Sequence, residues 1–348
     1  MEFSFHSFSE NAPGPVWQRH FNSLWPAYRR WFLRYGEADR PSYLESSIAI
    51  KSHMPEFFPV YESMVDLAGG GDHAARFLSQ YCPPPLFRGC SQAIHIADQA
   101  VMTRSYDYSP YIFDGLLMHS KFGSRRVIGM MDCMSGLLDG INDDGLAVSM
   151  SFGGREDYSE GFGISLILRY LLESAGNVAE AKELLDRLPV QGAYNVMLFD
   201  AELKHTTVVI SPGQQPRYLD DRVATNHQPD SSWPIYEEKV FTRERRQYLE
   251  SLISQVGMTT SEFNSCFLQA PLFHNQYGKG FGTLYDAAFY PQLKRCEYFW
   301  PQLNWVMDFE NFTEQSTRVE FYDPAGYPSN LQAYDEIYTA HPLPVLQF

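Results

Sequence analysis

The chain has 348 residues, of which 44% are apolar and 15% aromatic, enough for one large α/β domain or two smaller ones with a substantial core. This composition excludes an intrinsically disordered chain. The formal net charge of −15 argues against a general nucleic-acid or anionic-membrane binder, since both need a surplus of Lys and Arg. The expected partner is a small neutral or mixed-charge molecule.

The five cysteines are odd in number and scattered, unlike a disulfide framework, and no Cys/His spacing is typical of a zinc site. They are Cys82, Cys90, Cys133, Cys266 and Cys296. The N-terminus has no cationic flank leading into an apolar stretch, and no run approaches the roughly 18 apolar residues of a membrane span. These features predict a protein of the reducing cytoplasm, with no metal and no membrane partner.

Aromatic residues at intervals of three and four predict a helix over residues 17–35 with one broad aromatic face. That face is expected to pack against the rest of the protein rather than against a cofactor. Further helical patterns cover residues 56–67 and 73–81. The first eighty or so residues are therefore predicted to be mainly helical.

The sequence pattern changes at residues 82–87, where three consecutive prolines break any helix. Residues 92–107 then alternate as a β-hairpin. Further strands are predicted at 127–131, 146–152, 195–199, 206–210 and 283–289, and helices at 164–174, 178–188 and about 237–255. This order predicts antiparallel sheets sandwiched by helices rather than a regular alternation of strand and helix.

Cys90 opens the predicted hairpin directly after Gly89. A single cysteine is more often an inert core residue than a nucleophile. Arg104 and Asp107, however, lie on the return strand, and a guanidinium near sulfur favours the thiolate while a carboxylate can hold an ammonium group. Standing alone, these two residues would describe a surface ion pair. Their position beside Cys90 makes Cys90 the candidate nucleophile.

Four segments in a fixed order resemble the signatures of the cysteine N-terminal nucleophile (Ntn) hydrolases. They are Gly89-Cys90-Ser91, Arg104-Ser105-Tyr106-Asp107-Tyr108, Gly140-Ile141-Asn142-Asp143-Asp144-Gly145-Leu146 and Ala224-Thr225-Asn226-His227. More narrowly, the chain resembles the branch of acyl-coenzyme A:6-aminopenicillanic acid acyltransferases, with penicillin V acylases and bile-salt hydrolases as relatives. The resemblance spans residues 90 to about 290.

The resemblance implies an α+β fold, a four-layer αββα sandwich with two mainly antiparallel sheets between helical layers. It also implies a precursor that cuts itself between Gly89 and Cys90, giving a helical leader 1–89 that remains as a partner and a catalytic chain 90–348. A glycine before the bond allows a strained backbone in which the thiol reaches the preceding carbonyl. The cut frees an α-amino group, whose reference pKa of about 7.7 to 8.0 suits a base near neutral pH.

The resemblance also implies a role for each motif residue. Arg104 would lie beside the sulfur, and Asp107 would orient the new ammonium group. Asn226 and Asn142 would donate to the oxyanion of the tetrahedral intermediate, with Asn226 preferred because the pattern N-x-x-G is frequent in ordinary turns. The implied reaction is acyl transfer from a linear amide through a thioester on Cys90, to water or to an amine, without a cofactor.

Several alternatives stay open at this point. Relatives that hydrolyse bile salts carry a late active-site arginine, and Arg243, Arg245 and Arg246 are its candidates, each also interpretable as a solvent-facing partner of a nearby glutamate. The sequence separates neither hydrolase from acyltransferase nor monomer from homo-oligomer. The rival functions are a non-catalytic ligand-binding protein with the same fold and a hydrolase with an internal cysteine and a histidine base, His95 or His227.

Overall fold

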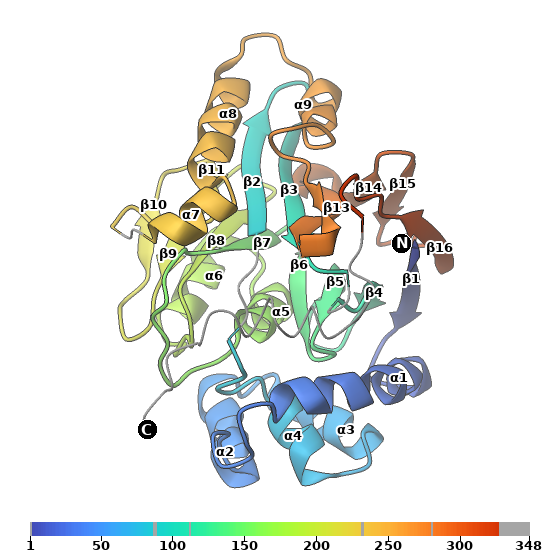
Figure 1. Cartoon of the computed structure of the whole chain (residues 1–348). Helices are drawn as coiled ribbons and strands as arrows, with labels where there is room; N and C mark the ends of the chain where they lie inside the picture. The colour runs from blue at the N-terminus through green and yellow to red at the C-terminus, as the bar shows by residue number, and fades with distance from the viewer. Residues whose placement is uncertain (1, 86–88, 111–112, 231–232, 280, 327–348) are drawn as a thin grey trace.

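The computed structural model describes residues 2–85, 89–110, 113–230, 233–279 and 281–326. Within these residues the strands form two sheets that face each other, with helices on both outer sides (Figure 1). Buried apolar side chains from both sheets and from several helices form one continuous cluster. The expected αββα sandwich with mainly antiparallel sheets is confirmed.

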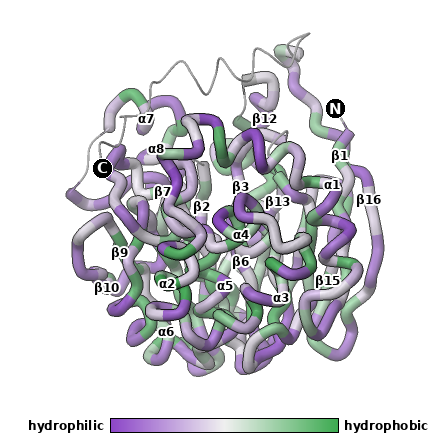
Figure 2. The backbone as a smooth tube through the Cα atoms, turned by 90° about the horizontal axis from the view of Figure 1, so that it is seen from below, coloured by the Kyte–Doolittle hydropathy of each residue, from purple (hydrophilic) through white to green (hydrophobic). Residues whose placement is uncertain are grey.

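The larger sheet contains nine of the described strands, and its neighbouring strands are antiparallel except for the parallel pair β1 and β4. In spatial order they are β10 (Arg217–Leu219), β9 (His205–Ile210), β8 (Tyr194–Phe199), β7 (Ala147–Phe152), β6 (Gly136–Asn142), β5 (Val127–Asp132), β4 (Leu116–Ser120), β1 (Glu2–Glu10) and β16 (Gln315–Glu320). Figure 2, which views the chain from below, shows β10 at one side and β16 beside β1 at the other. Helices α5 (Ile164–Ser174) and α6 (Val178–Leu185) pack against this sheet.

The smaller sheet begins with the hairpin predicted around Cys90. Its strands, in spatial order, are β11 (Val223–Ala224), β2 (Gly89–Ile96), β3 (Ala100–Tyr108), β13 (Phe281–Tyr290), β14 (Arg295–Trp300) and β15 (Leu303–Asp308), with β12 (Asn275–Gln276) also paired to β13. Helices α8 (Thr242–Ser254) and α9 (Thr260–Cys266) cover its outer face. Leu249 of α8 and Phe263 of α9 belong there to a separate apolar cluster that includes Ala93 and Val101.

The first eighty or so residues are mainly helical, as expected, but they begin with a strand. Helices α1 (Pro15–Phe32), α2 (Tyr43–His53), α3 (Phe58–Leu67) and α4 (Asp72–Leu78) lie together below the sandwich (Figure 1). The segment before them, however, is β1, which buries Phe5 and Phe8 between β4 and β16. The sequence pattern did not predict this strand, because a short strand is decided by partners that only the fold brings beside it.

The helix expected over about 237–255 is two helices. α7 (Pro234–Lys239) and α8 are separated at Phe241, whose φ of 50° lies in the left-handed region. A bulky residue in this conformation interrupts a helix. The break gives α8 its own direction, and α8 carries all three candidate arginines.

The described helices are short. The longest of those described, α1, has 18 residues and carries basic side chains at Arg29 and Arg30 in its last turn. Across the described part of the chain, no helix combines the length and apolarity that crossing a bilayer requires.

Candidate active site

Cys90 is the second residue of β2, directly beside β3. The strand register places Cys90 opposite Tyr106. Arg104 lies two residues before Tyr106 on β3, so the side chains of Cys90, Tyr106 and Arg104 all point to the inner face of the sheet. Nη2 of Arg104 donates to Sγ of Cys90 at 3.0 Å, and both residues are fully buried. A guanidinium at this distance favours the thiolate over the thiol.

Asp139, on β6 of the facing sheet, holds the guanidinium of Arg104 in place. Its Oδ2 accepts hydrogen bonds from Nη1 of Arg104 at 2.6 Å and from the hydroxyl of Tyr285 at 2.5 Å. Its Oδ1 accepts one from the hydroxyl of Tyr298 at 2.8 Å. Burial alone would lower the pKa of the guanidinium, but its charge interactions with Cys90, Tyr285 and Asp139 outweigh burial and raise that pKa. The guanidinium beside the sulfur therefore stays charged.

The backbone nitrogen of Cys90 lies in a second polar cluster. Oδ1 of Asn226 accepts hydrogen bonds from this nitrogen at 2.8 Å and from Nη2 of Arg245 at 2.7 Å. Two donors at one amide oxygen define the orientation of the Asn226 side chain, and its Nδ2 donates to the carbonyl of Phe152 at 3.3 Å. Nη1 of Arg245 donates to the carbonyl oxygen of Cys90 at 2.8 Å and lies 3.4 Å from Oδ2 of Asp107.

Of the three candidate arginines, the structure brings Arg245 to Cys90. Arg245 is fully buried, and burial lowers its pKa while the charge of Asp107 opposes that change. Arg243 and Arg246 instead form ion pairs with acidic residues nearer the surface. Which of the three arginines faces Cys90 depends on the rotation of α8 about its axis, and the spacing of the three residues in the sequence does not reveal that rotation.

Gly89 and Asp107 pack tightly against β13. Oδ1 of Asp107 accepts a hydrogen bond from Oγ1 of Thr283 at 2.7 Å, a contact that no sequence motif indicated. A Cβ atom on Gly89 would lie 2.2 Å from the ring of Phe281 and 3.0 Å from Cβ of Asp107. Gly89 is an ordinary strand residue here, so close packing, rather than a strained backbone, is what requires a glycine.

The structure does not bring Asn142 to this cluster. Asn142 ends β6, where its Nδ2 donates to the carbonyls of Leu172 and Ala175 at 2.9 and 2.6 Å. Its Oδ1 accepts from the backbone nitrogens of Asp144 and Leu146. Both amide hydrogens are therefore donated to backbone oxygens in this structure, contacts that fit a structural role, and the oxyanion role expected for Asn142 stays a prediction.

The two histidines considered as bases make contacts elsewhere. A ring nitrogen of His95 lies 3.0 Å from the carbonyl oxygen of Met258, and one of His227 lies 3.0 Å from Oγ1 of Thr242. Burial, followed by the charges of nearby arginines, lowers the pKa of His227 to about 4. The imidazole of His227 is therefore a weak base at neutral pH.

Among the described residues, Glu37, Asp72 and His73 are the group whose ligand atoms lie close enough together to hold a metal ion. The two carboxylates are exposed and already form ion pairs with Arg76 and His73. This group lies in the segment from the end of α1 to the start of α4 and includes none of the residues around Cys90.

Comparison with family models gives a match over residues 95–305, to the family described as acyl-coenzyme A:6-aminopenicillanic acid acyl-transferase. The matched stretch is more than half of the chain. It contains Arg104, Asp107, Asn226 and Arg245, and it begins five residues after Cys90. No curated protein sequence matches the chain.

Solved structures similar to this one include a penicillin V acylase from Agrobacterium tumefaciens, at 12% identity and a TM-score of 0.46, covering 66% of this chain and 90% of that one. A mutant conjugated bile acid hydrolase from Clostridium perfringens is 13% identical, with a TM-score of 0.42 and coverages of 67% and 97%. A Caenorhabditis elegans ortholog of N-acylethanolamine-hydrolyzing acid amidase is 15% identical, with a TM-score of 0.43 and coverages of 63% and 99%. From the family match over residues 95–305, the chain belongs to the acyl-coenzyme A:6-aminopenicillanic acid acyl-transferase family.

Proposed function

We propose that this enzyme is a self-processing amidase or acyltransferase that acts on the carbon–nitrogen bond of a linear amide through a thioester on Cys90. The observation that carries the proposal is the placement of Cys90. Its sulfur lies 3.0 Å from Arg104, and its own nitrogen donates to Asn226 at 2.8 Å. Once that nitrogen is released from its peptide bond, one residue supplies both a nucleophile and a base to the same site.

In the proposed self-cleavage, Sγ of Cys90 attacks the carbonyl carbon of Gly89. The C–N bond between these residues breaks, the thiol proton passes to the leaving nitrogen, and residues 1–89 are held as a thioester. Water then hydrolyses the thioester, which leaves a carboxylate on Gly89 and restores the thiol. The hydrogen bond from Arg245 to the carbonyl oxygen of Cys90 supports this step by holding the first peptide unit of the new chain.

In the proposed mature enzyme, the new amino group takes the proton of the attacking thiol and later returns it to the leaving amine. Oδ1 of Asn226 accepts a hydrogen bond from this nitrogen already in the uncut chain. Arg245 donates to the same Oδ1 and also forms an ion pair with Asp107, so it connects Asp107 to Asn226. Nδ2 of Asn226 is the donor that we assign to the oxyanion of the tetrahedral intermediate. Arg104 stabilises the thiolate as nucleophile and as leaving group.

The acyl group passes to water in a hydrolase and to an amine in an acyltransferase. Both reactions use the same thioester on Cys90, and they differ in which acceptor reaches it first. We propose a linear amide with an apolar or aromatic acyl group as the substrate, and a reducing compartment such as the cytoplasm, because the thiol of a cysteine nucleophile has to stay reduced.

Mass spectrometry of the purified chain tests the proposal. We expect wild-type protein to yield two fragments separated before Cys90, and Cys90→Ala to yield one chain of 348 residues. Cys90→Ser keeps the side-chain shape and is expected to cleave slowly and to lose most amide turnover, because a hydroxyl is a weaker nucleophile than a thiolate. Wild-type protein that stays intact yet hydrolyses amides would refute the free-amine mechanism, and a fully active serine variant would refute the role of sulfur.

A further inference from the structure

The turn between β5 and β6 holds two consecutive residues in the left-handed conformation. Cys133 and Met134 have φ angles of 52° and 59°. Neither is a glycine or an asparagine, the residues that adopt this conformation at little cost. Such a backbone persists only where surrounding contacts determine it, and it is frequent near functional sites. Contacts from the rest of the fold must therefore hold this turn.

Helix α1 of the proposed leader lies against this turn and supplies two of the contacts (Figure 1). Nε1 of Trp17 donates to the carbonyl of Met134 at 2.9 Å. The hydroxyl of Tyr28 accepts a hydrogen bond from the backbone nitrogen of Cys133 at 3.1 Å and donates to Oδ1 of Asp114. Oδ2 of Asp114 accepts from the backbone nitrogen of Met134 at 3.3 Å. The hydroxyl of Tyr28 is thus at the centre of the contacts that hold the turn.

The strand that follows the turn carries a β-bulge. Two neighbouring residues of β5 lie opposite Leu137 and Asp139, so Leu138 is the extra residue of the bulge. Its carbonyl accepts a hydrogen bond from Nη1 of Arg104 at 2.9 Å, and the same nitrogen donates to Oδ2 of Asp139 at 2.6 Å. The bulge therefore directs two consecutive residues of β6 to the guanidinium beside the sulfur.

The register of this hairpin decides which way Asp139 points. Side chains alternate along a strand, so a shift of one residue would turn Asp139 away from the facing sheet that carries Arg104. In a hairpin the conformation and length of the turn set the register. A turn that loses its contacts with α1 can relax from the left-handed conformation, and the inward direction of Asp139 then loses support.

We propose that Tyr28 is a positioning residue for the reaction at Cys90. Through the turn between β5 and β6 it keeps Asp139 directed at Arg104, whose Nη2 donates to the sulfur. The proposal rests on the function proposed above and extends it, because the proposed leader then supports the chemistry of the cut enzyme as well as its fold.

Steady-state kinetics of two matched tyrosine variants test the proposal. Tyr28→Phe removes the hydroxyl but keeps the ring, whose centroid lies 4.9 Å from that of Phe77. We expect kcat to fall about threefold to fivefold with KM within about twofold, because a misplaced Arg104 affects the thiolate rather than substrate binding.

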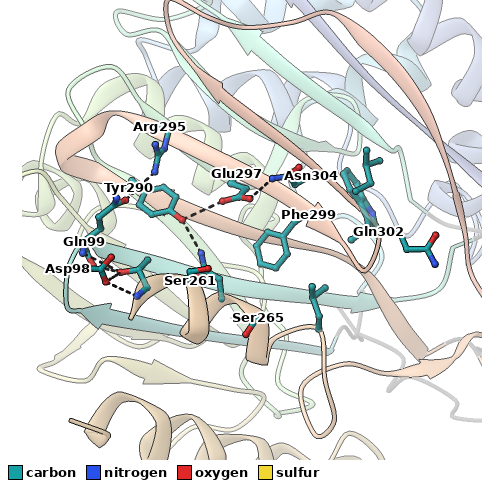
Figure 3. A pocket seen from close by; sticks show the side chains of 15 residues that line it. Asp98, Gln99, Ser261, Ser265, Tyr290, Arg295, Glu297, Phe299, Gln302 and Asn304 are labelled. Carbon is teal, nitrogen blue, oxygen red and sulfur yellow. Dashed lines mark hydrogen bonds between the residues drawn. The ribbon is translucent and has the colours of Figure 1, made fainter. Parts of the chain in front are cut away.

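The control, Tyr290→Phe, makes the same change in a groove on the outer face of the smaller sheet (Figure 3). There the hydroxyl of Tyr290 accepts from Nδ2 of Asn264 at 2.9 Å and lies 3.4 Å from Oε2 of Glu297. We expect this variant to keep the wild-type kcat. Wild-type kcat in folded Tyr28→Phe, or an equal loss in the two variants, overturns the proposal.

A double variant tests the route through Asp139. If Tyr28 acts by placing Asp139, then Tyr28→Phe combined with Asp139→Asn is expected to turn over within about twofold of Asp139→Asn alone. A merely structural role of Tyr28 would make the two losses multiply, and that result would overturn the proposed route.

Alkylation of Cys90 by iodoacetamide at different pH values, followed by mass spectrometry, gives a readout that needs no amide substrate. A displaced Arg104 favours the thiolate less, so the alkylation midpoint of Tyr28→Phe is expected about half a pH unit above that of wild type. An unchanged midpoint overturns the proposal. A midpoint that moves in a chain that neither cuts itself nor turns over amides would refute the proposed function and still support the positioning of Arg104 by Tyr28.

Discussion

The two asparagines that come from the family motifs, Asn142 and Asn226, have different surroundings in the fold. Oδ1 of Asn226 accepts hydrogen bonds from the nitrogen of Cys90 and from Arg245. The side chain of Asn142 instead bonds to backbone groups, with Oδ1 in its own turn and Nδ2 at the end of α5. An amide that binds at the reacting residue acts on the reaction, and one that binds only backbone acts on stability. Alanine substitutions separate these roles.

We expect Asn226→Ala to lower kcat by roughly a hundredfold or more with little change in KM, because an oxyanion donor acts mainly in the transition state. Asn142→Ala is expected to lower the free energy of unfolding by about 2 to 4 kcal/mol, since several buried hydrogen bonds worth about 1 kcal/mol each are lost, while turnover per folded molecule is preserved. Steady-state kinetics and denaturant unfolding of both variants check this. A kcat loss confined to Asn142→Ala would reverse the assignment.

Arg104 reaches the sulfur of Cys90 through a side chain that is held from the other sheet. Asp139 accepts one hydrogen bond from this guanidinium and one each from two tyrosines, all in a fully buried setting. Asp139 reaches Cys90 through Arg104, so it acts as a positioning residue. Its carboxylate keeps Nη2 of Arg104 directed at the sulfur.

Asp139→Asn is expected to lower kcat by roughly tenfold, equivalent to about 1.4 kcal/mol, with KM within about twofold, because the neutral amide holds Arg104 less firmly. The control is Asp144→Asn, which makes the same change at an exposed ion pair with Arg125 and is expected to leave kcat unchanged. Melting temperatures measured alongside distinguish a variant that fails to fold from a folded variant in which Arg104 is misplaced. Wild-type kcat in folded Asp139→Asn would show that Arg104 needs no such support.

At the scale of elements, the start of β2 is packed from two sides. β3 pairs with it through Gly89 and Asp107, and the ring of Phe281 on β13 occupies the space where a side chain on Gly89 would lie. The scissile bond that we propose therefore lies in a position that tolerates only a glycine. Self-cleavage should be sensitive to the volume of this residue.

Gly89→Ala is expected to slow self-cleavage by roughly tenfold or more, because overpacking by one methyl group costs about 1 to 3 kcal/mol. Phe281→Ala combined with Gly89→Ala removes the opposing ring and is expected to restore much of the rate. Gly71→Ala, at a position where a new Cβ meets no atom within 4 Å, serves as control. Denaturing gels over time measure the cut fraction, and a double variant as slow as the single one would contradict the packing explanation.

At the scale of the whole molecule, the N-terminal segment that we propose as the leader is built into the sandwich. β1 lies between β4 and β16, and Nε1 of Trp17 in α1 donates to the buried carbonyl of Met134 at 2.9 Å. A cut before Cys90 breaks none of these contacts. The leader is therefore a structural part of the larger sheet, and its loss would leave β16 without its described neighbour.

We expect the two fragments of the cut protein to co-elute in native size-exclusion chromatography and to separate only in denaturant. Phe5→Asp, which places a charge at a fully buried position of β1, is expected to reduce the yield of associated fragments strongly. Ser4→Asp makes the neighbouring change on the exposed face and is expected to behave as wild type. Wild-type fragments that separate without denaturant would contradict this picture.

The sequence by itself determined the local parts of the site. Cys90, Arg104 and Asp107 lie on one hairpin, which the alternation of polar and apolar residues predicted, and the family resemblance implied that Arg104 lies beside the sulfur. The order of strand and helix patterns predicted antiparallel sheets between helices, and four short motifs in a fixed order indicated the family and its four-layer sandwich. Asn226 was found only through its motif, since nothing in its own neighbourhood indicates a contact with Cys90.

Tertiary structure alone decided the remaining parts. Arg245 was selected from three near neighbours by the direction of α8, which starts after the left-handed residue Phe241. Asp139 joined the site from the facing sheet, and β1 became a strand between partners far along the chain. Local patterns encode which face of an element is apolar, but contacts between distant segments depend on how whole elements pack, and no local pattern carries that information.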